Sequence, residues 1–357
     1  MPDLNFISAD NKNIRYMGRI DFADKKNPML IYAGSTVSFD FTGTSLTVLI
    51  RNYAVTEKTV IGYFIDNRQY SVILSRDDKY PVTQINVSTD GRTDERHSFT
   101  LFKRMDGYHM FQFCGFYIDQ NAHILPGAPV SKRRMECYGD SVSCGAVCEA
   151  ADHLASTDPE NNMGLMDNCW YAYNMITARI LGASINNISQ GGAAVLDSTG
   201  YCFAPYYPGM ETIYSKLRYI PYFETSQWDF SLYTPDVVLI ALGQNDPHCE
   251  GHPDNNINDP EFRQRWISSY SGILNDLIAK YPQADFILFT TILMHDEAWD
   301  KAIDEIFTQS QNSRVHRFRF RRTASATPGH PRIPEQEEMA AELSEYISSL
   351  GSDIWAE

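Results

Sequence analysis

The stretch from Glu136 to Gly145 constrains this chain most, because it reads as the end of a buried strand followed at once by a tight turn at Gly139. Asp140 and Ser141 then stand where we expect a helix to begin. A serine in that position has an exposed hydroxyl and a free N–H at the positive end of the helix. This geometry suits a nucleophile whose reaction passes through an oxyanion. For an isolated Gly-Asp-Ser tripeptide, the simpler interpretation is a turn in which Ser141 caps the helix.

Three further stretches favour the nucleophile. A continuous apolar run, Val237 to Leu242, is typical of a strand buried on both faces, and it stops at Gly243-Gln244-Asn245-Asp246. Ser189-Gln190-Gly191-Gly192 follows another apolar run. His330 lies in Pro328-Gly329-His330-Pro331, just before a segment with the spacing of a helix. Each predicted strand therefore ends at a turn that carries a polar or glycine residue, and one histidine precedes the last helix.

The order of these four blocks resembles the SGNH hydrolases (the GDSL esterases and lipases). The likeness covers nearly the whole chain and narrows to carbohydrate esterase family 2. The residues that carry the narrower resemblance are Gly18-Arg19, Phe39 to Thr44, Arg133-Arg134 leading into Gly139-Asp140-Ser141, Trp228-Asp229-Phe230 and Pro235 to Val238. That resemblance implies an N-terminal jelly roll joined to an SGNH domain. It also implies removal of acetyl groups from plant polysaccharides such as xylan and glucomannan.

Eight short segments in the first part of the chain read as strands, several with alternating apolar and polar residues and with turn residues between them. They are Leu30–Tyr32, Thr36–Phe41, Leu46–Ile50, Thr59–Ile65, Tyr70–Leu74, Gln84–Val87, Ser98–Lys103 and Met110–Ile118. This pattern predicts an all-β jelly-roll sandwich over residues 1–126. Such a domain could bind carbohydrate or serve as structural support, and the sequence shows no clear sugar platform on it.

After a linker rich in Pro and Gly, strands alternate with helices over residues 132–357. The expected helices are Asn168–Leu181, Phe262–Tyr281 and Glu335–Leu350, and the expected strands include Ile185–Ser189 and Asp285–Leu293. This alternation predicts an α/β three-layer domain with a central parallel sheet. Active sites of such sheets gather at the carboxyl ends of the strands, so Ser141, Gly191 and Asn245 should meet at one edge.

Ester hydrolysis needs a nucleophile, a base that later acts as an acid, and donors to the oxyanion. Under the resemblance, Ser141 is the nucleophile and gives one N–H, and His330 is the base. Gly191 gives a second N–H, Asn245 a side-chain amide, and Asp140 a supporting hydrogen bond. Taken singly, each of these is equally well a turn or helix-start residue, but together such readings are improbable.

The position three residues before the catalytic histidine, where the superfamily usually has Asp, is Thr327 here. Threonine cannot supply a negative charge to an imidazolium. We therefore expect a Ser141–His330 dyad whose other ring nitrogen is held by a neutral oxygen. A carboxylate brought in from a distant part of the chain is the alternative that stays open.

The remaining histidines point less clearly to a site. His248 and His252 flank Cys249, with Asp254 close by, but this spacing in a loop is poor evidence for a metal, so we expect neither a metal nor another cofactor. His295 could reach the cleft. A lipase or thioesterase acting on non-sugar esters, and a carbohydrate-binding protein without activity, remain the rival functions.

Charge and composition limit the partners. The net charge of −15 argues against nucleic acid and anionic lipid surfaces, whereas neutral acetylated sugars are compatible with it. No run approaches the length of a membrane span, and no leader opens the sequence. Seven cysteines without zinc-type spacing read as reduced thiols, so we expect a cytoplasmic protein, or a secreted one if a leader was removed. Homo-oligomerisation stays open.

Overall fold

The structure, a computed structural model, describes residues 4–75, 83–89, 95–127, 129–160, 164–248 and 255–356. The chain forms two compact units. The first comprises residues 1–130 with 163–165, and the second comprises residues 131–162 with 166–357.

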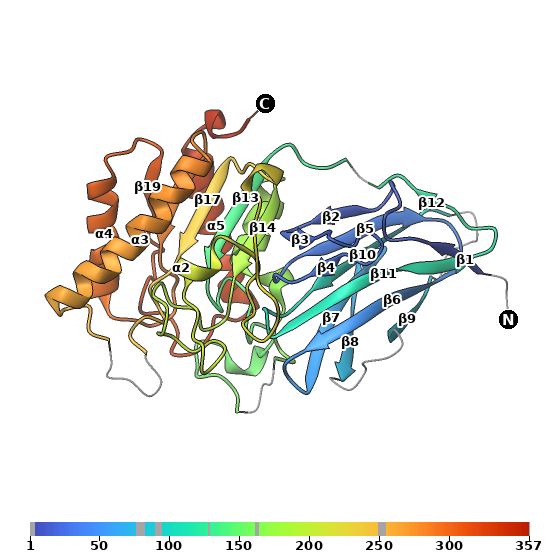
Figure 1. The fold of residues 1–357 in the computed structure, drawn as a ribbon, viewed down its shortest axis with the longest axis horizontal. Helices are drawn as coiled ribbons and strands as arrows, with labels where there is room; N and C mark the ends of the chain where they lie inside the picture. The colour runs from blue at the N-terminus through green and yellow to red at the C-terminus, as the bar shows by residue number, and fades with distance from the viewer. Residues whose placement is uncertain are drawn as a thin grey trace. The chain divides into compact units, whose positions relative to one another are not determined.

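Two antiparallel sheets build the first unit, with strand orders β3-β4-β11-β6-β9 and β12-β5-β10-β7-β8; β1 pairs with β11 and β2 with β5 (Figure 1). The strands are β1 Leu4–Ile7, β2 Arg15–Met17, β3 Ile20–Asp21, β4 Met29–Leu30, β5 Thr36–Phe41, β6 Ser45–Ala54, β7 Lys58–Ile65, β8 Arg68–Ser75, β9 Thr83–Ser88, β10 His97–Lys103, β11 His109–Asp119 and β12 Ile124–Leu125. The β-sandwich predicted from the sequence is confirmed.

Alternation along β5 shows why these residues form a sandwich. Val37, Phe39 and Phe41 are fully buried, while Ser38 and Asp40 between them face outward. Phe39 of one sheet stacks on Phe116 of the other, with ring centroids 4.0 Å apart. Seven of the eight expected strands appear close to their predicted positions, and the strand expected over Leu30–Tyr32 is instead β4, Met29–Leu30. The short strands β2, β3 and β12 and the terminal strand β1 were missed because two to four residues give no readable alternation.

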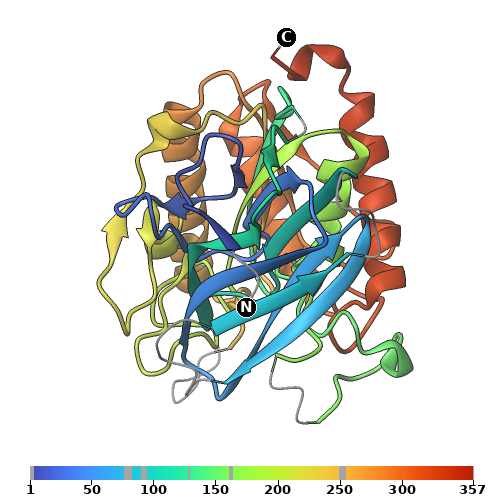
Figure 2. The same cartoon turned by 90° about the vertical axis from the view of Figure 1, so that its right-hand side faces the viewer.

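A five-stranded parallel sheet in the order β14-β13-β17-β18-β19 forms the centre of the second unit (Figure 1). Its strands are β13 Arg134–Gly139, β14 Ser184–Ser189, β17 Val237–Ala241, β18 Asp285–Phe289 and β19 Val315–Arg317. The helices are α1 Tyr173–Ile180, α2 Met210–Ile213, α3 Pro260–Lys280, α4 Glu297–Ser310 and α5 Ile333–Ser349. β15 Lys216–Arg218 and β16 Ser226–Gln227 form a hairpin. Figure 2 shows α5, in red, as one continuous helix.

Crossovers between parallel strands are almost always right-handed, so connections that run in opposite directions along the sheet place their helices on opposite faces. The chain passes from β13 to β14 through α1 in one direction, and from β17 to β19 through α3 and α4 in the other. Consistent with this, α1 packs against α5, and α3 packs against α2 and α4. The predicted three-layer α/β domain is therefore confirmed. Among the described residues, no helix has both the length and the apolar character needed to cross a membrane.

Two details differ from the sequence-based expectation. The helix expected from Asn168 begins as a short 3-10 turn, Cys169–Tyr171, and the α-helix starts only at Tyr173 because Ala172 is extended (φ −67°, ψ 144°). No α-helix follows Ser141: residues 141–149 form consecutive turns. Gly145 and Val147 have positive φ there, +67° and +54°, which a right-handed helix does not allow.

Candidate active site

Ser141 lies just beyond the end of β13. Gly139, the last residue of that strand, leaves no room for a side chain, since a Cβ there would lie 2.2 Å from the Ser143 hydroxyl oxygen. The turn is closed by hydrogen bonds from the N–H of Cys144 to the carbonyl of Asp140 (3.1 Å) and from the N–H of Ala146 to that of Ser141 (3.0 Å). The Ser141 side chain is thus fixed at the carboxyl edge of the sheet by the backbone around it.

His330 reaches Ser141 from the loop between β19 and α5. Its Nε2 atom lies 2.8 Å from Ser141 Oγ, although the two residues are far apart in the sequence. Ser141 Oγ–H is a donor, so Nε2 accepts and the other ring nitrogen, Nδ1, carries the proton. The sequence-predicted nucleophile and base are therefore within hydrogen-bond distance of one another.

The expected dyad is wrong in its geometry, because a carboxylate holds the other ring nitrogen. His330 Nδ1 lies 2.5 Å from Asp158 Oδ2, and the His330 backbone N–H donates to Asp158 Oδ1 at 2.9 Å. A Cβ at Gly329 would lie 2.7 Å from Asp158 Oδ1, so glycine permits this close approach. Thr327, at the position expected to be acidic, is buried, and its hydroxyl has no hydrogen-bond partner among the described residues.

Arg332 completes this group of charges. Its fully buried guanidinium lies 2.9 Å from Asp158 Oδ1 and also donates to the carbonyl oxygens of His330 (2.5 Å) and Thr157 (3.3 Å). Burial alone would raise the pKa of Asp158. The hydrogen bonds and positive charge of His330, together with the hydrogen bond from Arg332, outweigh it and hold that pKa well below its usual range. Asp158 is therefore a carboxylate that can stabilise an imidazolium at His330.

The other predicted residues gather at the same edge of the sheet. In the parallel register, Gly139 pairs with Ser189 on one side and with Ala241 on the other. The turns that follow these strands, carrying Gly191 and Asn245, therefore flank the turn of Ser141. The backbone N–H of Gln190 donates to the carbonyl of Gly139 at 3.2 Å, which ties the first two turns together.

Asn245 and Asp140 contact each other beneath the serine turn. The Asn245 amide donates to the carbonyl of Ala193 at 3.1 Å and makes a longer contact, 3.4 Å, with Asp140 Oδ2. Asp140 also accepts from the N–H of Val142 at 3.0 Å and from the Gln244 amide at 3.0 Å. Burial raises the pKa of Asp140 to about 6, although the Val142 N–H and the nearby rings of His330 and His295 lower it. The Asp140 carboxylate therefore links the turn of Ser141 to Gln244 and Asn245.

Asp246 fixes the turn of Asn245 from below. Its carboxylate is fully buried and accepts from the N–H of Val195 (2.9 Å) and from Trp266 Nε1 (2.8 Å). Because Val195 lies four residues after Gly191, this carboxylate connects the turns that carry Gly191 and Asn245. The sequence alone indicates only that Asp246 is a turn residue.

Among the remaining predicted residues, His248 is exposed and packs against Tyr201, with ring centroids 4.7 Å apart. Cys249, His252 and Asp254 lie outside the described residues. Within the described part of the chain, no group of three or more His, Cys, Asp or Glu side chains is placed to hold a metal ion.

A serine, a histidine and a carboxylate at the carboxyl edge of a parallel sheet, in the order Gly-Asp-Ser, Gly-x-Asn-Asp and His, define a chain with the SGNH-hydrolase fold. Residues 16–129 match the family described as carbohydrate esterase 2 N-terminal. The resemblance to carbohydrate esterase family 2 is thereby confirmed, and the chain is a relative of those esterases.

Two curated proteins and one solved structure illustrate the relationship. The chain is 27% identical over 282 residues to the cellulase/esterase CelE of Acetivibrio thermocellus, an alignment that covers 77% of this chain and 30% of CelE. It is 23% identical over 364 residues to the acetylxylan esterase / glucomannan deacetylase of Cellvibrio japonicus, covering 98% and 92% of the two chains. A family two carbohydrate esterase structure from C. japonicus superimposes with a TM-score of 0.78, 22% identity and 98% of each chain covered. This last match shows a shared fold.

Asp158 is the functional candidate that sequence reasoning did not select. The sequence gives one weak signal, an acidic residue before Pro159 in the polar loop that follows the nucleophile. Asp152 and Glu160 lie in the same loop, so composition alone does not distinguish the residue that meets His330.

Proposed function

We propose that this chain is a serine esterase that removes O-acetyl groups from plant cell-wall polysaccharides or oligosaccharides, such as acetylated xylan or glucomannan. The observation that carries the proposal is the hydrogen-bonded series Ser141 Oγ, His330 Nε2, His330 Nδ1 and Asp158 Oδ2, with contacts of 2.8 and 2.5 Å. The curated names acetylxylan esterase and glucomannan deacetylase, carried by the C. japonicus relative, support the acetylated sugar as substrate.

In the first half of the reaction, His330 Nε2 takes the proton from Ser141 as Oγ attacks the acetyl carbonyl carbon. The negative charge that develops on the carbonyl oxygen is stabilised by the N–H groups of Ser141 and Gly191 and by the amide of Asn245. Asp158 stabilises the imidazolium. The tetrahedral intermediate then collapses as His330 gives its proton to the departing sugar oxygen, which leaves as an alcohol and leaves an acetyl group on Ser141.

In the second half, water replaces the sugar. His330 takes a proton from the water as its oxygen attacks the acetyl-serine carbonyl, and the same donors stabilise the second oxyanion. Collapse returns the proton from His330 to Ser141 Oγ and releases acetate. The Asn245 hydrogen that makes the long 3.4 Å contact with Asp140 is the one we expect to turn toward the oxyanion, since its present hydrogen bond is weak.

An exposed aromatic surface beside the site supports a sugar substrate. Tyr201 is 46% exposed, and its backbone N–H donates to the carbonyl of Gly192 at 2.8 Å, next to the turn of Gly191. Packing against His248 holds the Tyr201 ring, which leaves an apolar ring face for contact with a sugar.

Acetate release tests the function. Purified enzyme and its Ser141→Ala variant should be assayed in parallel on acetylated xylan, acetylated glucomannan and short- and long-chain nitrophenyl esters. We expect release from at least one acetylated glycan, preference for the short-chain ester, and loss of nearly all activity in a folded Ser141→Ala protein. Preference for long acyl chains would instead identify a lipase or thioesterase, and binding of glycans without acetate release would identify a carbohydrate-binding protein.

A further inference from the structure

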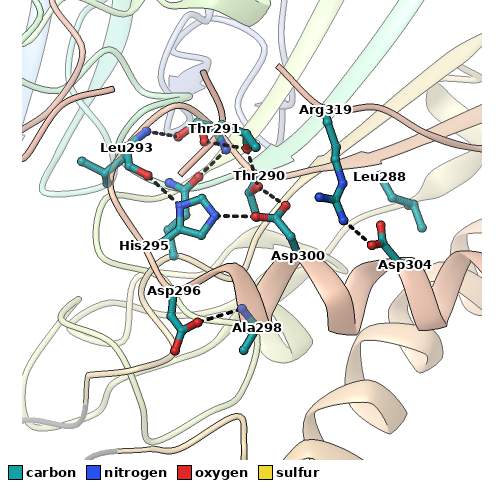
Figure 3. A network of polar contacts seen from close by, with 12 residues as sticks. Leu288, Thr290, Thr291, Leu293, His295, Asp296, Ala298, Asp300, Asp304 and Arg319 are labelled. Atoms are coloured by element: carbon teal, nitrogen blue, oxygen red, sulfur yellow. Dashed lines mark hydrogen bonds and ion pairs between the residues drawn. The ribbon is translucent and has the colours of Figure 1, made fainter. Parts of the chain in front are cut away.

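A second histidine lies behind the site, in the loop formed by residues 290–296 between β18 and α4. The His295 side chain is 3% exposed, and both of its ring nitrogens have partners. Nδ1 lies 2.6 Å from the carbonyl oxygen of Leu293, and Nε2 lies 2.9 Å from Asp300 Oδ2. Figure 3 shows the ring between these two oxygens.

The chemistry of these two partners sets the charge of the ring. A carbonyl oxygen only accepts hydrogen bonds, and so does an ionised carboxylate, so each ring nitrogen must donate. Two groups other than His295 favour the ionised form of Asp300: the guanidinium of Arg317 lies 2.8 Å from Oδ1, and the Thr290 hydroxyl donates to the same oxygen at 2.7 Å. Asp300 is therefore ionised. His330 differs, because its Nε2 faces the Ser141 hydroxyl, which is a donor.

Charged groups on each neighbouring element are consistent with this assignment. From α4, Asp300 also accepts from Thr290 Oγ1 (2.7 Å) and pairs with Arg317 of β19 (2.8 Å). Arg317 pairs in turn with Asp304, which also binds Arg319. Asp140, beside the nucleophile, is the further acidic group that interacts electrostatically with His295.

The loop held by His295 supports the segment that carries His330. The N–H of Ala326 donates to the carbonyl of Ile292 (3.1 Å), and the N–H of Met294 donates to that of Thr327 (3.0 Å). Leu293 and Thr327 form a parallel bridge. Thr327 lies three residues before His330, so a shift of the 290–296 loop would shift the base.

The same loop also contacts the nucleophile's side of the site. The N–H of Thr291 donates to Gln244 Oε1 at 2.5 Å, and the Gln244 amide donates to Asp140 next to Ser141. One loop therefore supports both Ser141 and His330. Thr290 and His295 lie at the two ends of this loop, and both bind Asp300. They are therefore placed to fix the loop.

We propose that His295 is a positioning residue held as an imidazolium between Leu293 and Asp300, and that it fixes the loop on which the placement of His330 depends. It touches neither substrate nor the reacting atoms. The effect on turnover rests on the proposed esterase function, whereas the charge of the ring does not.

Ring NMR of ¹⁵N-histidine-labelled enzyme tests the charge directly. We expect His295 to show N–H signals at both ring nitrogens at about pH 7. These signals are assigned to His295 because they are absent from the spectrum of His295→Gln. A single protonated nitrogen would overturn the proposal. This NMR measurement does not depend on turnover, and the esterase function is tested separately by Ser141→Ala. Failure of the proposal for His295 can therefore be distinguished from failure of the proposed function.

Turnover of His295→Gln tests the positioning. We expect kcat to fall about 10- to 100-fold with KM little changed, since a small displacement of a catalytic group has effects of this size. The downfield proton of the His330–Asp158 hydrogen bond should also shift or broaden. An unchanged kcat together with an unchanged His330 signal would overturn the proposal.

His316 offers a matched control. It lies on β19, and its Nε2 contacts Asp285 Oδ1 at 2.7 Å, while Asp285 also pairs with Arg314. This is the same His–Asp–Arg arrangement, but Asp285 begins β18 at the end of the sheet away from the site. His316→Gln should keep kcat within about two-fold of the wild type while losing a comparable amount of stability. Equal losses of kcat in both variants would show a general structural effect and overturn the positioning role.

Discussion

His330 Nδ1 lies 2.5 Å from Asp158 Oδ2, a carboxylate 172 residues earlier in the chain. The acid that orients the histidine therefore comes from the loop after the nucleophile and not from the histidine's own segment, where Thr327 stands in its place. Arg332, two residues after His330, holds the same carboxylate at 2.9 Å. The negative charge of Asp158 is thus supplied by the loop that follows Ser141. Arg332, the cation that holds Asp158, comes from the same segment as His330.

Replacing Asp158 tests whether this carboxylate contributes to catalysis. Asp158→Asn keeps the shape but removes the charge and can place its NH2 against Nδ1–H, so we expect kcat to fall about 10³- to 10⁴-fold. Steady-state acetate release measures this. Thr327→Val is the control, because the buried Thr327 hydroxyl has no partner in the described structure and its loss should leave kcat unchanged. A near wild-type kcat in Asp158→Asn would instead favour a Ser141–His330 dyad that works without the carboxylate.

The pH dependence of unfolding tests the charge of Asp158. Its pKa in the folded state lies below the unfolded value of about 3.9, so its stabilising contribution is present above about pH 4 and is lost as the pH falls further. We expect Asp158→Asn to be less stable by about 1–3 kcal/mol at neutral pH. The difference from wild type should shrink between about pH 5 and pH 3 in urea unfolding. A difference that does not change with pH would contradict the assignment.

The positions of Ser141 and His330 could be predicted from local patterns, because each residue follows or precedes a regular element. Asp158 was not, since its role depends on the path of the loop after residue 149, which no periodicity determines. Helix α4 was readable but was missed: Asp296 caps it, and Trp299, Ile303 and Ile306 have helical spacing and are buried. The prediction of a helix after Ser141 was wrong because Gly145 and Val147 have positive φ angles, which interrupt a right-handed helix. These angles depend on tertiary packing and cannot be predicted from the local sequence.

Asp246 provides a second test of pH dependence, with the opposite sign. Burial raises its pKa to about 7, against hydrogen bonds from Val195 and Trp266 that lower it. Between about pH 4 and pH 7 the unfolded chain releases this proton while the folded chain keeps it, so the group destabilises the fold as the pH rises. Asp246→Asn lacks this effect. Its stability relative to wild type should therefore increase from about pH 5 to pH 7 and level off above. A flat difference in urea unfolding over this range would refute the raised pKa.

Tyr201 is the residue we expect to affect substrate binding rather than chemistry. Tyr201→Ala removes the ring that packs on His248, and it should raise KM for acetylated glycans about 10-fold with little change in kcat, because a sugar–aromatic contact is made in both ground and transition states. For a small nitrophenyl acetate the change should be slight. Tyr201→Phe, which keeps the ring, should resemble wild type. An equal loss on both substrates would place Tyr201 in the support of the site instead.

Asn245 should act in the transition state. Its amide is held by the carbonyl of Ala193 at 3.1 Å, which fixes the side chain and leaves one hydrogen only weakly bound to Asp140. Losing one donor to the oxyanion should lower kcat by about 10²- to 10³-fold with little change in KM. Asn255→Ala is the control, because that amide donates to the carbonyl of Asp246 at 2.8 Å in the same region but does not contact Asp140 or Ala193. The control should keep kcat within about three-fold. A rise in KM with kcat preserved in Asn245→Ala would reassign Asn245 to substrate binding, because uniform binding of substrate and transition state changes KM alone.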